Sequence, residues 1–153
     1  MGVAASLVTA PIDAPAELAA FLAEAAGVGA VVSFCGVARP AGKDGSPVDA
    51  LHLEHHPRMT GPSLQAIAEA GARRFATGHV RVVHRCGAVR AGETIVFVAA
   101  ASAHRRAAFD AADYVMDRLK TDALFWKREE GPGTSRWIEP SEDDRLDRAR
   151  WGE

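Results

Sequence analysis

The chain has 153 residues, of which 48% are apolar and 25% are charged, and its formal net charge at pH 7 is −2. A chain of this size and composition is expected to form one globular domain with a substantial core. The small net charge argues against bulk electrostatic binding to nucleic acid, and no apolar run reaches the roughly 20 residues that cross a bilayer. A cytoplasmic enzyme or binding domain is therefore expected.

Hydrophobic periodicity and turn-forming residues divide the chain into interleaved helices and strands. Asp13 before Pro15 is typical of a helix start, and the β-branched run 29–37 predicts a buried strand. The stretch 39–47 consists of turn-forming and charged residues and predicts a flexible loop. The predicted elements are, in chain order, a helix over 16–26, strands over 29–37 and 48–56, a helix over 60–75, strands over 80–86 and 94–101, a helix over 103–120, and strands over 124–130 and 135–139.

Several connections are short enough for hairpins, so the fold class is α+β with a mainly antiparallel sheet. We expect a single catalytic domain over 1–140, followed by a charged tail over 141–153 that is solvated or frayed. Ser102 is expected to cap the long helix over 103–120. The apolar stripe of that helix, predicted to face the core, contains Phe109, Ala112, Val115, Met116 and Leu119.

The stretch LKTDALFWKREEGPGTSRW places two lysines, Lys120 and Lys127, around an aromatic pair, and Arg136 follows after a turn. Strand alternation puts Phe125 and Lys127 on one face, and the short turn after the helix lets both amines point into one cleft. Such a cluster of cations could hold anionic reactants. The alternative is that Lys120 is an ordinary surface cation favoured by the helix C-terminus.

The start of the long helix offers a second candidate anion site at His104 and Arg105. Exposed backbone N–H groups at a helix N-terminus bind anions, and these side chains would add donors. The alternative is that His104 caps the helix and the arginines are solvated. Cations are unfavourable at a helix N-terminus without an anion nearby, which favours a phosphate or carboxylate ligand.

His52, Glu54 and His56 have the spacing of a strand face and raise the possibility of a metal site. No further ligand cluster accompanies them, so we expect packing and hydrogen-bonding roles and no metal or other cofactor. Cys35 and Cys86 lie far apart without a CxxC spacing, which fits a reducing compartment. Both thiols are expected to be inert.

Several longer segments together resemble the catalytic (large) subunit family of molybdopterin synthase. The similarity covers most of the chain between about residues 29 and 139, in the order of the family. Its most specific part is the sequence SAHR, followed by a helix and then by LKT…FWK. The segments that carry it are GAVVSFCGVAR, LHLEHHPRM, VHRCGAVRAGETIVFVAAASAHRRAAFDAADYVMDRLKTDALFWKRE and RWIE.

The resemblance implies an α/β hammerhead fold with an additional small antiparallel β subdomain. It implies a sulfurtransferase that converts cyclic pyranopterin monophosphate into molybdopterin, during molybdenum cofactor biosynthesis, by installing a dithiolene. The sulfur would come from a small ubiquitin-like partner whose C-terminal Gly-Gly carries a thiocarboxylate. Large subunits would pair as a homodimer, giving a heterotetramer with two small subunits.

The same resemblance assigns roles to residues. Lys120 would face the thiocarboxylate of the partner, and Lys127 would act on the substrate. The loop that follows Arg39 would be a lid or a substrate-ordered segment. Residues matching the anion pocket of the family are Arg39, His104, Arg105 and Arg136.

Two other interpretations use the same residues without this chemistry. A non-enzymatic module could hold the C-terminus of a partner protein in a basic cleft. A hydrolase or transferase of phosphorylated metabolites could use His104 as acid or base. The second would need no protein partner.

Overall fold

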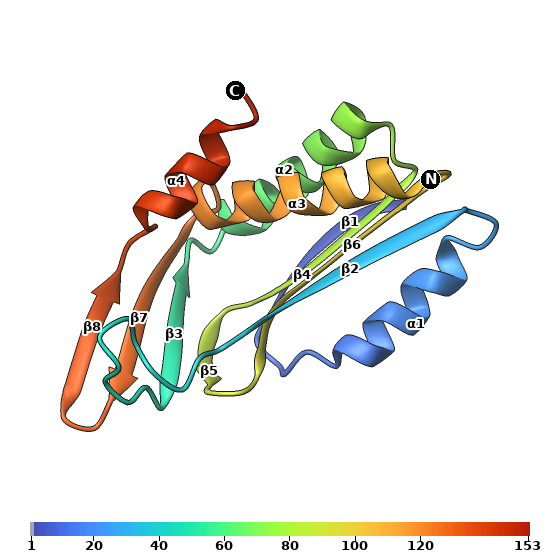
Figure 1. The fold of residues 1–153 in the computed structure, drawn as a ribbon. Coiled ribbons are helices and arrows are strands. Elements are labelled where there is room, and N and C mark those ends of the chain that lie inside the picture. Colours follow the sequence, from blue (N-terminus) through green and yellow to red (C-terminus); the bar gives the residue numbers. More distant parts are fainter. Residues whose placement is uncertain (1) are drawn as a thin grey trace.

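The computed structural model describes residues 2–153, and within that range it contains eight strands and four helices (Figure 1). No helix among these residues is long and apolar enough to cross a membrane. The elements are β1 (Gly2–Val8), α1 (Ala14–Glu24), β2 (Ala30–Val37), β3 (Ala50–His55), α2 (Thr60–Phe75), β4 (His79–Arg85), β5 (Gly87–Arg90), β6 (Thr94–Ser102), α3 (Arg105–Thr121), β7 (Phe125–Gly131), β8 (Thr134–Ile138) and α4 (Glu142–Ala149).

The larger sheet has the strand order β1-β4-β6-β2 and is covered by helices on both faces. β1 runs parallel to β4, whereas β4–β6 and β6–β2 are antiparallel. Helices α2 and α3 lie on one face and α1 lies on the other (Figure 1). The predicted α+β class and the mainly antiparallel pairing are therefore confirmed.

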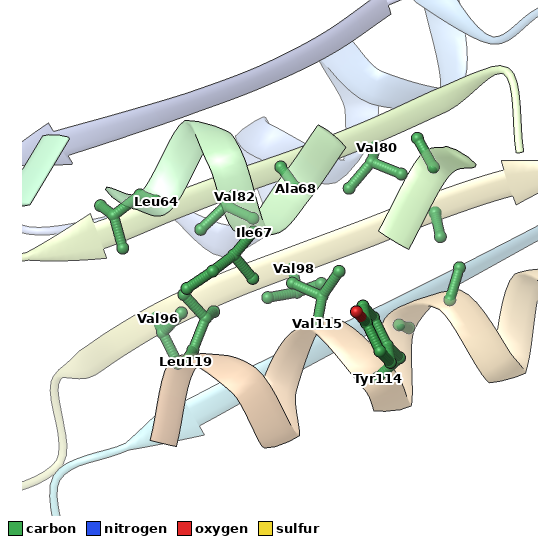
Figure 2. Packing of buried hydrophobic residues seen from close by; sticks show 14 residues of the cluster. Leu64, Ile67, Ala68, Val80, Val82, Val96, Val98, Tyr114, Val115 and Leu119 are labelled. Atoms are coloured by element: carbon green, nitrogen blue, oxygen red, sulfur yellow. The ribbon is translucent and has the colours of Figure 1, made fainter. Parts of the chain in front are cut away.

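Strand alternation explains how one sheet supplies two cores. Along β6, Val96 and Val98 pack against α2 and α3, while Phe97 and Ala99 pack toward α1 on the opposite face. Figure 2 shows the first of these cores, in which Leu64 and Ile67 of α2 and Val115 and Leu119 of α3 meet the valines of β4 and β6. These side chains are almost completely buried, so this core holds α3 firmly on the sheet.

The smaller sheet has the order β5-β3-β7-β8 and is antiparallel throughout. Its own small core consists of Ala38, Leu53 and Val89, with Phe125 packed against it. Phe125 also contacts the main core, so β7 joins the two sheets at the point where α3 ends. This junction positions the segment that carries the two lysines.

The structure corrects the prediction that the strand over 29–37 is buried. β2 is the edge strand of the larger sheet, paired only with β6, and its Phe34 and Val37 are 43% and 50% exposed. Phe109, predicted to face the core, is 53% exposed, whereas Val115 and Leu119 of the same stripe are buried. Apolar composition predicted burial here, but it does not distinguish a core face from an apolar patch on the surface.

The prediction that Ser102 caps the long helix is also wrong. Ser102 is the last residue of β6, and His104 occupies the N-cap position of α3 without a capping hydrogen bond from its side chain. Two strands, β1 and β5, were not anticipated. The signal for β1 was present as alternating Val3, Ala5 and Leu7, which pack against the main core.

The charged tail is ordered, which contradicts the alternative of a frayed segment, although no residue of its helix is fully buried. Residues Glu142–Ala149 form α4, and a capping box joins Ser141 and Asp144 at its start. Trp151 packs against the main core after the helix ends. The signal was Ser141 followed three residues later by an acidic residue, which is typical of a helix N-terminus.

Candidate active site

The two candidate lysines are brought together by the turn between α3 and β7. Lys120 lies in the last turn of α3, and Lys127 is the third residue of β7. The turn is fixed by Thr60, whose fully buried hydroxyl donates to the carbonyl of Leu124 at 2.7 Å and accepts from the N–H of His56 at 2.8 Å. The start of α2 thereby holds the linker that separates the lysines.

The environment of Lys127 makes its ammonium group unusually acidic. Burial, reinforced by the positive charge of Lys120, lowers the pKa of Lys127 from its ordinary 10.5 to about 8. The carboxylate of Asp144 acts in the opposite direction. A lysine with this pKa exchanges a proton near neutral pH, which an ordinary surface lysine does not.

A buried imidazole forms one wall beside the lysine pair. His84, at 4% exposure, stacks on the ring of Phe125 with a centroid separation of 4.1 Å and an interplanar angle of 22°. Its Nδ1–H donates to the carbonyl of Arg85 at 2.8 Å. Burial, together with the charges of Lys127 and Lys120, lowers the pKa of His84 to about 4, so the ring is neutral at pH 7. Sequence reasoning did not single out this residue.

Asp144 is the other residue near the lysines that sequence reasoning missed. Burial alone would raise its pKa, but hydrogen bonds from Ser141 and the charges of Lys120 and Lys127 outweigh that effect and lower it. The site therefore combines two amines, one neutral imidazole and one carboxylate, contributed by α3, β7, β4 and α4.

The predicted anion-binding residues His104 and Arg105 do not join this group within one chain. They lie at the opposite end of α3 from Lys120, about 22 Å away for a rise of 1.5 Å per residue. Arg39 lies just beyond the end of the edge strand β2 and is exposed. A single copy of the chain therefore presents two separate cationic regions.

Arg136 lies nearer to the lysines, but it is engaged elsewhere. It pairs with Glu129 on the face of the hairpin that also carries Lys127. Its guanidinium donates to Asp44 at 3.0 Å and to Glu129 at 3.2 Å. Asp44 belongs to the loop predicted to be flexible, and these contacts tie that loop to the hairpin.

Within the loop itself, further hydrogen bonds oppose free movement. The N–H of Gly42 donates to the carbonyl of Ser46 at 2.9 Å, and that of Val48 donates to Pro40 at 2.9 Å. A β-bridge pairs Ala41 with Pro47. The description of this segment as flexible is therefore corrected to a hydrogen-bonded loop held against β8.

A groove of about 510 Å³ lies between β2 and α3. Its apolar lining includes Val32, Phe34, Phe109 and Met116, and Arg105 contributes a cation. The lysine pair does not line it. The groove thus connects the exposed apolar edge of the larger sheet with one of the predicted anion-binding residues.

The His52, Glu54 and His56 set does not form a metal centre. Across residues 2–153, no three His, Cys, Asp or Glu side chains gather as metal ligands. The ring of His56 accepts N–H bonds from Arg58 and Met59, and Glu54 forms an ion pair with Arg128 at 3.5 Å. These are structural contacts of the turn before α2 and of the smaller sheet.

The two thiols occupy different environments. Cys86 is buried, and burial raises the pKa of its thiol, which makes it a poor nucleophile at neutral pH. Cys35 is exposed on β2, contrary to the expectation of an apolar, enclosed position. Neither thiol is among the groups gathered around the lysine pair.

Comparison with known proteins identifies the family. The family model described as "MoaE protein" matches residues 7–122, which is more than half of the chain. The chain belongs to the MoaE family. A relative from Caulobacter vibrioides, named molybdopterin synthase catalytic subunit, is 45% identical over 146 residues, covering 95% of both chains.

Solved structures of MoaE proteins have the same fold. A molybdopterin biosynthesis MoaE protein from Burkholderia ambifaria MC40-6 superposes with a TM-score of 0.82 at 39% identity, covering 100% of this chain and 99% of the other. A complex of subunits 1 and 2 of molybdopterin-converting factor from Helicobacter pylori 26695 has a TM-score of 0.72 at 17% identity, covering 88% and 89%. At that identity the second match concerns the fold alone.

Proposed function

We propose that this chain is the catalytic subunit of a molybdopterin synthase. It transfers sulfur from the C-terminal thiocarboxylate of a small ubiquitin-like partner to cyclic pyranopterin monophosphate. The observation that carries the proposal is the pairing of Lys120 with Lys127, whose pKa is lowered to about 8 beside a neutral His84. Membership of the MoaE family, whose relatives are named for this synthase, supports the same conclusion.

The chemistry requires groups that manage negative charge and protons. In each sulfur transfer the thiocarboxylate sulfur bonds to a side-chain carbon of the pterin, and that carbon loses its bond to oxygen, which leaves with a proton. Water then breaks the acyl–sulfur bond, so the sulfur stays on the pterin and the partner leaves with a carboxylate. Thiocarboxylate, phosphate and the acyl-transfer transition state are all anionic. Fixed cations in a partly dehydrated site stabilise such charge. In this proposal the ammonium of Lys120 faces the thiocarboxylate, and Lys127 holds or releases a proton at the substrate.

Two copies of the chain are needed to unite the predicted site residues. His104 and Arg105 lie about 22 Å along α3 from Lys120, too far to contact the same small substrate within one copy. The exposed Phe34, Phe109 and the groove between β2 and α3 provide an apolar surface suited to pairing. We propose a homodimer on this surface, in which these two residues approach the lysines of the neighbouring copy. With two small subunits the assembly is a heterotetramer.

The proposed reaction is tested by mixing purified protein, thiocarboxylated partner and the cyclic precursor. Mass spectrometry of the pterin should detect a product with two added sulfur atoms, dependent on the thiocarboxylate. Lys127→Ala should reduce product by about 100-fold or more. Arg73→Ala, which removes an exposed cation of α2, is the matched control and should retain activity. Product formation that does not require the partner would refute the proposal.

A mixing experiment tests whether the site is shared between copies. Lys120→Ala and Arg105→Ala are each expected to be inactive as pure proteins. After subunit exchange, mixed dimers contain one intact site, so roughly a quarter of wild-type activity should return. Recovery is expected only if the two residues act in one site from different chains. No recovery, with exchange verified by mass spectrometry, would show that the sharing is wrong.

A further inference from the structure

The charged C-terminal segment is docked on α3. The Trp151 ring lies edge-on to Phe75 and Tyr114, with centroid separations of 5.6 and 5.4 Å. Its Nε1–H donates to Asp117 of α3 at 2.6 Å. Glu153 accepts from the Tyr114 hydroxyl at 2.6 Å. The last residues are therefore anchored against the middle of α3 and the end of α2.

Ion pairs hold α4 along the same helix. Arg148 donates to Asp122, the residue that caps the C-terminus of α3, at 3.1 Å. Arg118 donates to the same carboxylate at 2.7 Å. Arg150 bridges Asp113 and Asp117 at 2.6 and 2.9 Å. These contacts fix the position and orientation of α4. The N-terminus of α4 lies toward the C-terminal end of α3, which carries Lys120.

The connectivity places Asp144 beside the lysine pair. Ile138, the last residue of β8, is the strand partner of Lys127, and α4 begins four residues later. At the other end of the helix, Arg148 contacts Asp122, two residues after Lys120. Asp144 lies in the first turn of α4, between these two attachment points.

The capping box orients the carboxylate of Asp144. Its Oδ2 accepts from the N–H of Ser141 at 2.9 Å, while its own N–H donates to the Ser141 hydroxyl at 3.1 Å. This reciprocal pair holds the carboxylate at the start of α4. Neither lysine makes a direct ion pair within residues 2–153, so the carboxylate acts on them through space.

We propose that Asp144 is a positioning residue for the Lys120–Lys127 pair, and that the docked C-terminal segment holds it in place. The inference rests on the proposed function only for its effect on catalysis. Two like charges in a partly buried site repel each other, and one fixed carboxylate offsets part of that repulsion. The carboxylate would therefore keep Lys127 more protonated than burial and Lys120 alone would allow.

The charges around Lys127 support this role. The titratable groups that interact electrostatically with Lys127 are Lys120 from α3, His84 from β4 and Asp144 from α4. Of these, His84 is neutral at pH 7 and Lys120 disfavours the ammonium form. Asp144 is the group with the opposite effect, and both lysines in turn lower its own pKa.

The chain is well suited to a direct test because it contains only three lysines, Lys43, Lys120 and Lys127. Protein labelled with ¹³C at the lysine ε-carbon gives three side-chain signals whose titration can be followed by NMR. Asp144→Asn keeps an oxygen that can accept from Ser141 but removes the charge. We expect it to lower the titration midpoint of Lys127 by up to about one pH unit.

Two matched variants complete the experiment. Asp143→Asn removes an exposed carboxylate from the same first turn of α4 and should leave the Lys127 midpoint unchanged. Asp144→Glu restores the charge and should return the midpoint toward the wild-type value. The exposed Lys43 serves as an internal reference.

Failure of this inference is distinguishable from failure of the proposed function. An unchanged Lys127 midpoint in folded Asp144→Asn protein, or an equal shift in Asp143→Asn, would overturn the role of Asp144. The titration needs neither substrate nor partner, so it stands even if no dithiolene is formed. If the proposed function also holds, the pH–rate profile of Asp144→Asn should move to lower pH together with the Lys127 midpoint.

Discussion

The removal of Lys127 from water makes its charged form unfavourable in the folded protein. We therefore expect this side chain to lower the free energy of unfolding of the wild-type protein. The folded-state pKa is about 8, against an ordinary value of 10.5. At about 1.4 kcal/mol per pH unit, the difference corresponds to about 3 kcal/mol of destabilisation when the side chain must be charged. Lys127→Met removes the charge and keeps an unbranched apolar side chain. We therefore expect this variant to be more stable than wild type by up to about 3 kcal/mol at pH 7.

The pH dependence of this gain has a definite sign. Below about pH 8 the lysine is protonated in both states, so its full unfavourable contribution is present. Between pH 8 and 10.5 the unfolded chain binds a proton that the folded protein lacks, so the stability of wild type rises with pH. The advantage of Lys127→Met should therefore be largest below pH 8 and disappear as pH approaches 10.5.

Urea unfolding followed by circular dichroism at pH 6.5, 8 and 9.5 and at one protein concentration measures this difference. Lys43→Met, at an exposed loop position, is the control and should show no pH-dependent gain. A Lys127→Met protein that is no more stable than wild type at pH 6.5 would contradict the reasoning. So would a gain that stays constant up to pH 9.5. The same variant should form no dithiolene product, since it lacks the amine.

Three other substitutions test separate features of the structure. Lys120→Ala removes a like charge, so the pKa of Lys127 should rise in an NMR titration, and product should fall by about 100-fold or more. Trp151→Ala should lower the free energy of unfolding by about 2 kcal/mol and increase hydrogen exchange in α4, because the ring contacts and the indole hydrogen bond are lost. Cys35→Ala combined with Cys86→Ala should retain activity with thiocarboxylated partner, because the partner delivers the sulfur.

For each of these three substitutions, one result would contradict the prediction. Near-normal turnover by Lys120→Ala would show that Lys120 is not required for the proposed reaction. Leu146→Ala, at a 58% exposed position of α4, is the control for Trp151→Ala, and an equal loss of stability in both would show that the ring is not the anchor. Loss of activity in the folded double cysteine variant would mean that a thiol of this chain takes part in the reaction.

Local patterns predicted the elements near the site well. The helix over 60–75 has those bounds, and the helix over 103–120 and the strand over 124–130 correspond to α3 and β7 with small shifts at their ends. Periodicity depends on residues three or four positions apart, which the sequence displays directly. The proximity of Lys120 and Lys127 could be predicted for the same reason, since only a short turn separates them.

The errors occurred where distant residues decide the outcome. The apolar composition of β2 indicated burial, but its place at the sheet edge follows from pairing with β6 alone. The charged tail looked like a solvated segment, yet Arg74 and Glu153, 79 positions apart, form an ion pair that fastens its end. Asp144 and His84 were missed because their relation to the lysines exists only after α4 and β4 have packed.

By itself, the sequence determined most of the helices and strands, including α3 and β7, and it placed two amines on either side of one short turn, because these properties depend on neighbouring residues. Only the tertiary structure decided that Lys127 is largely removed from water, that His84 is a neutral ring near it, and that His104 and Arg105 lie at the opposite end of α3 from the lysines. Desolvation and charge–charge interactions depend on distance in space, and the groups that influence Lys127 of β7 come from three other elements, α3, β4 and α4.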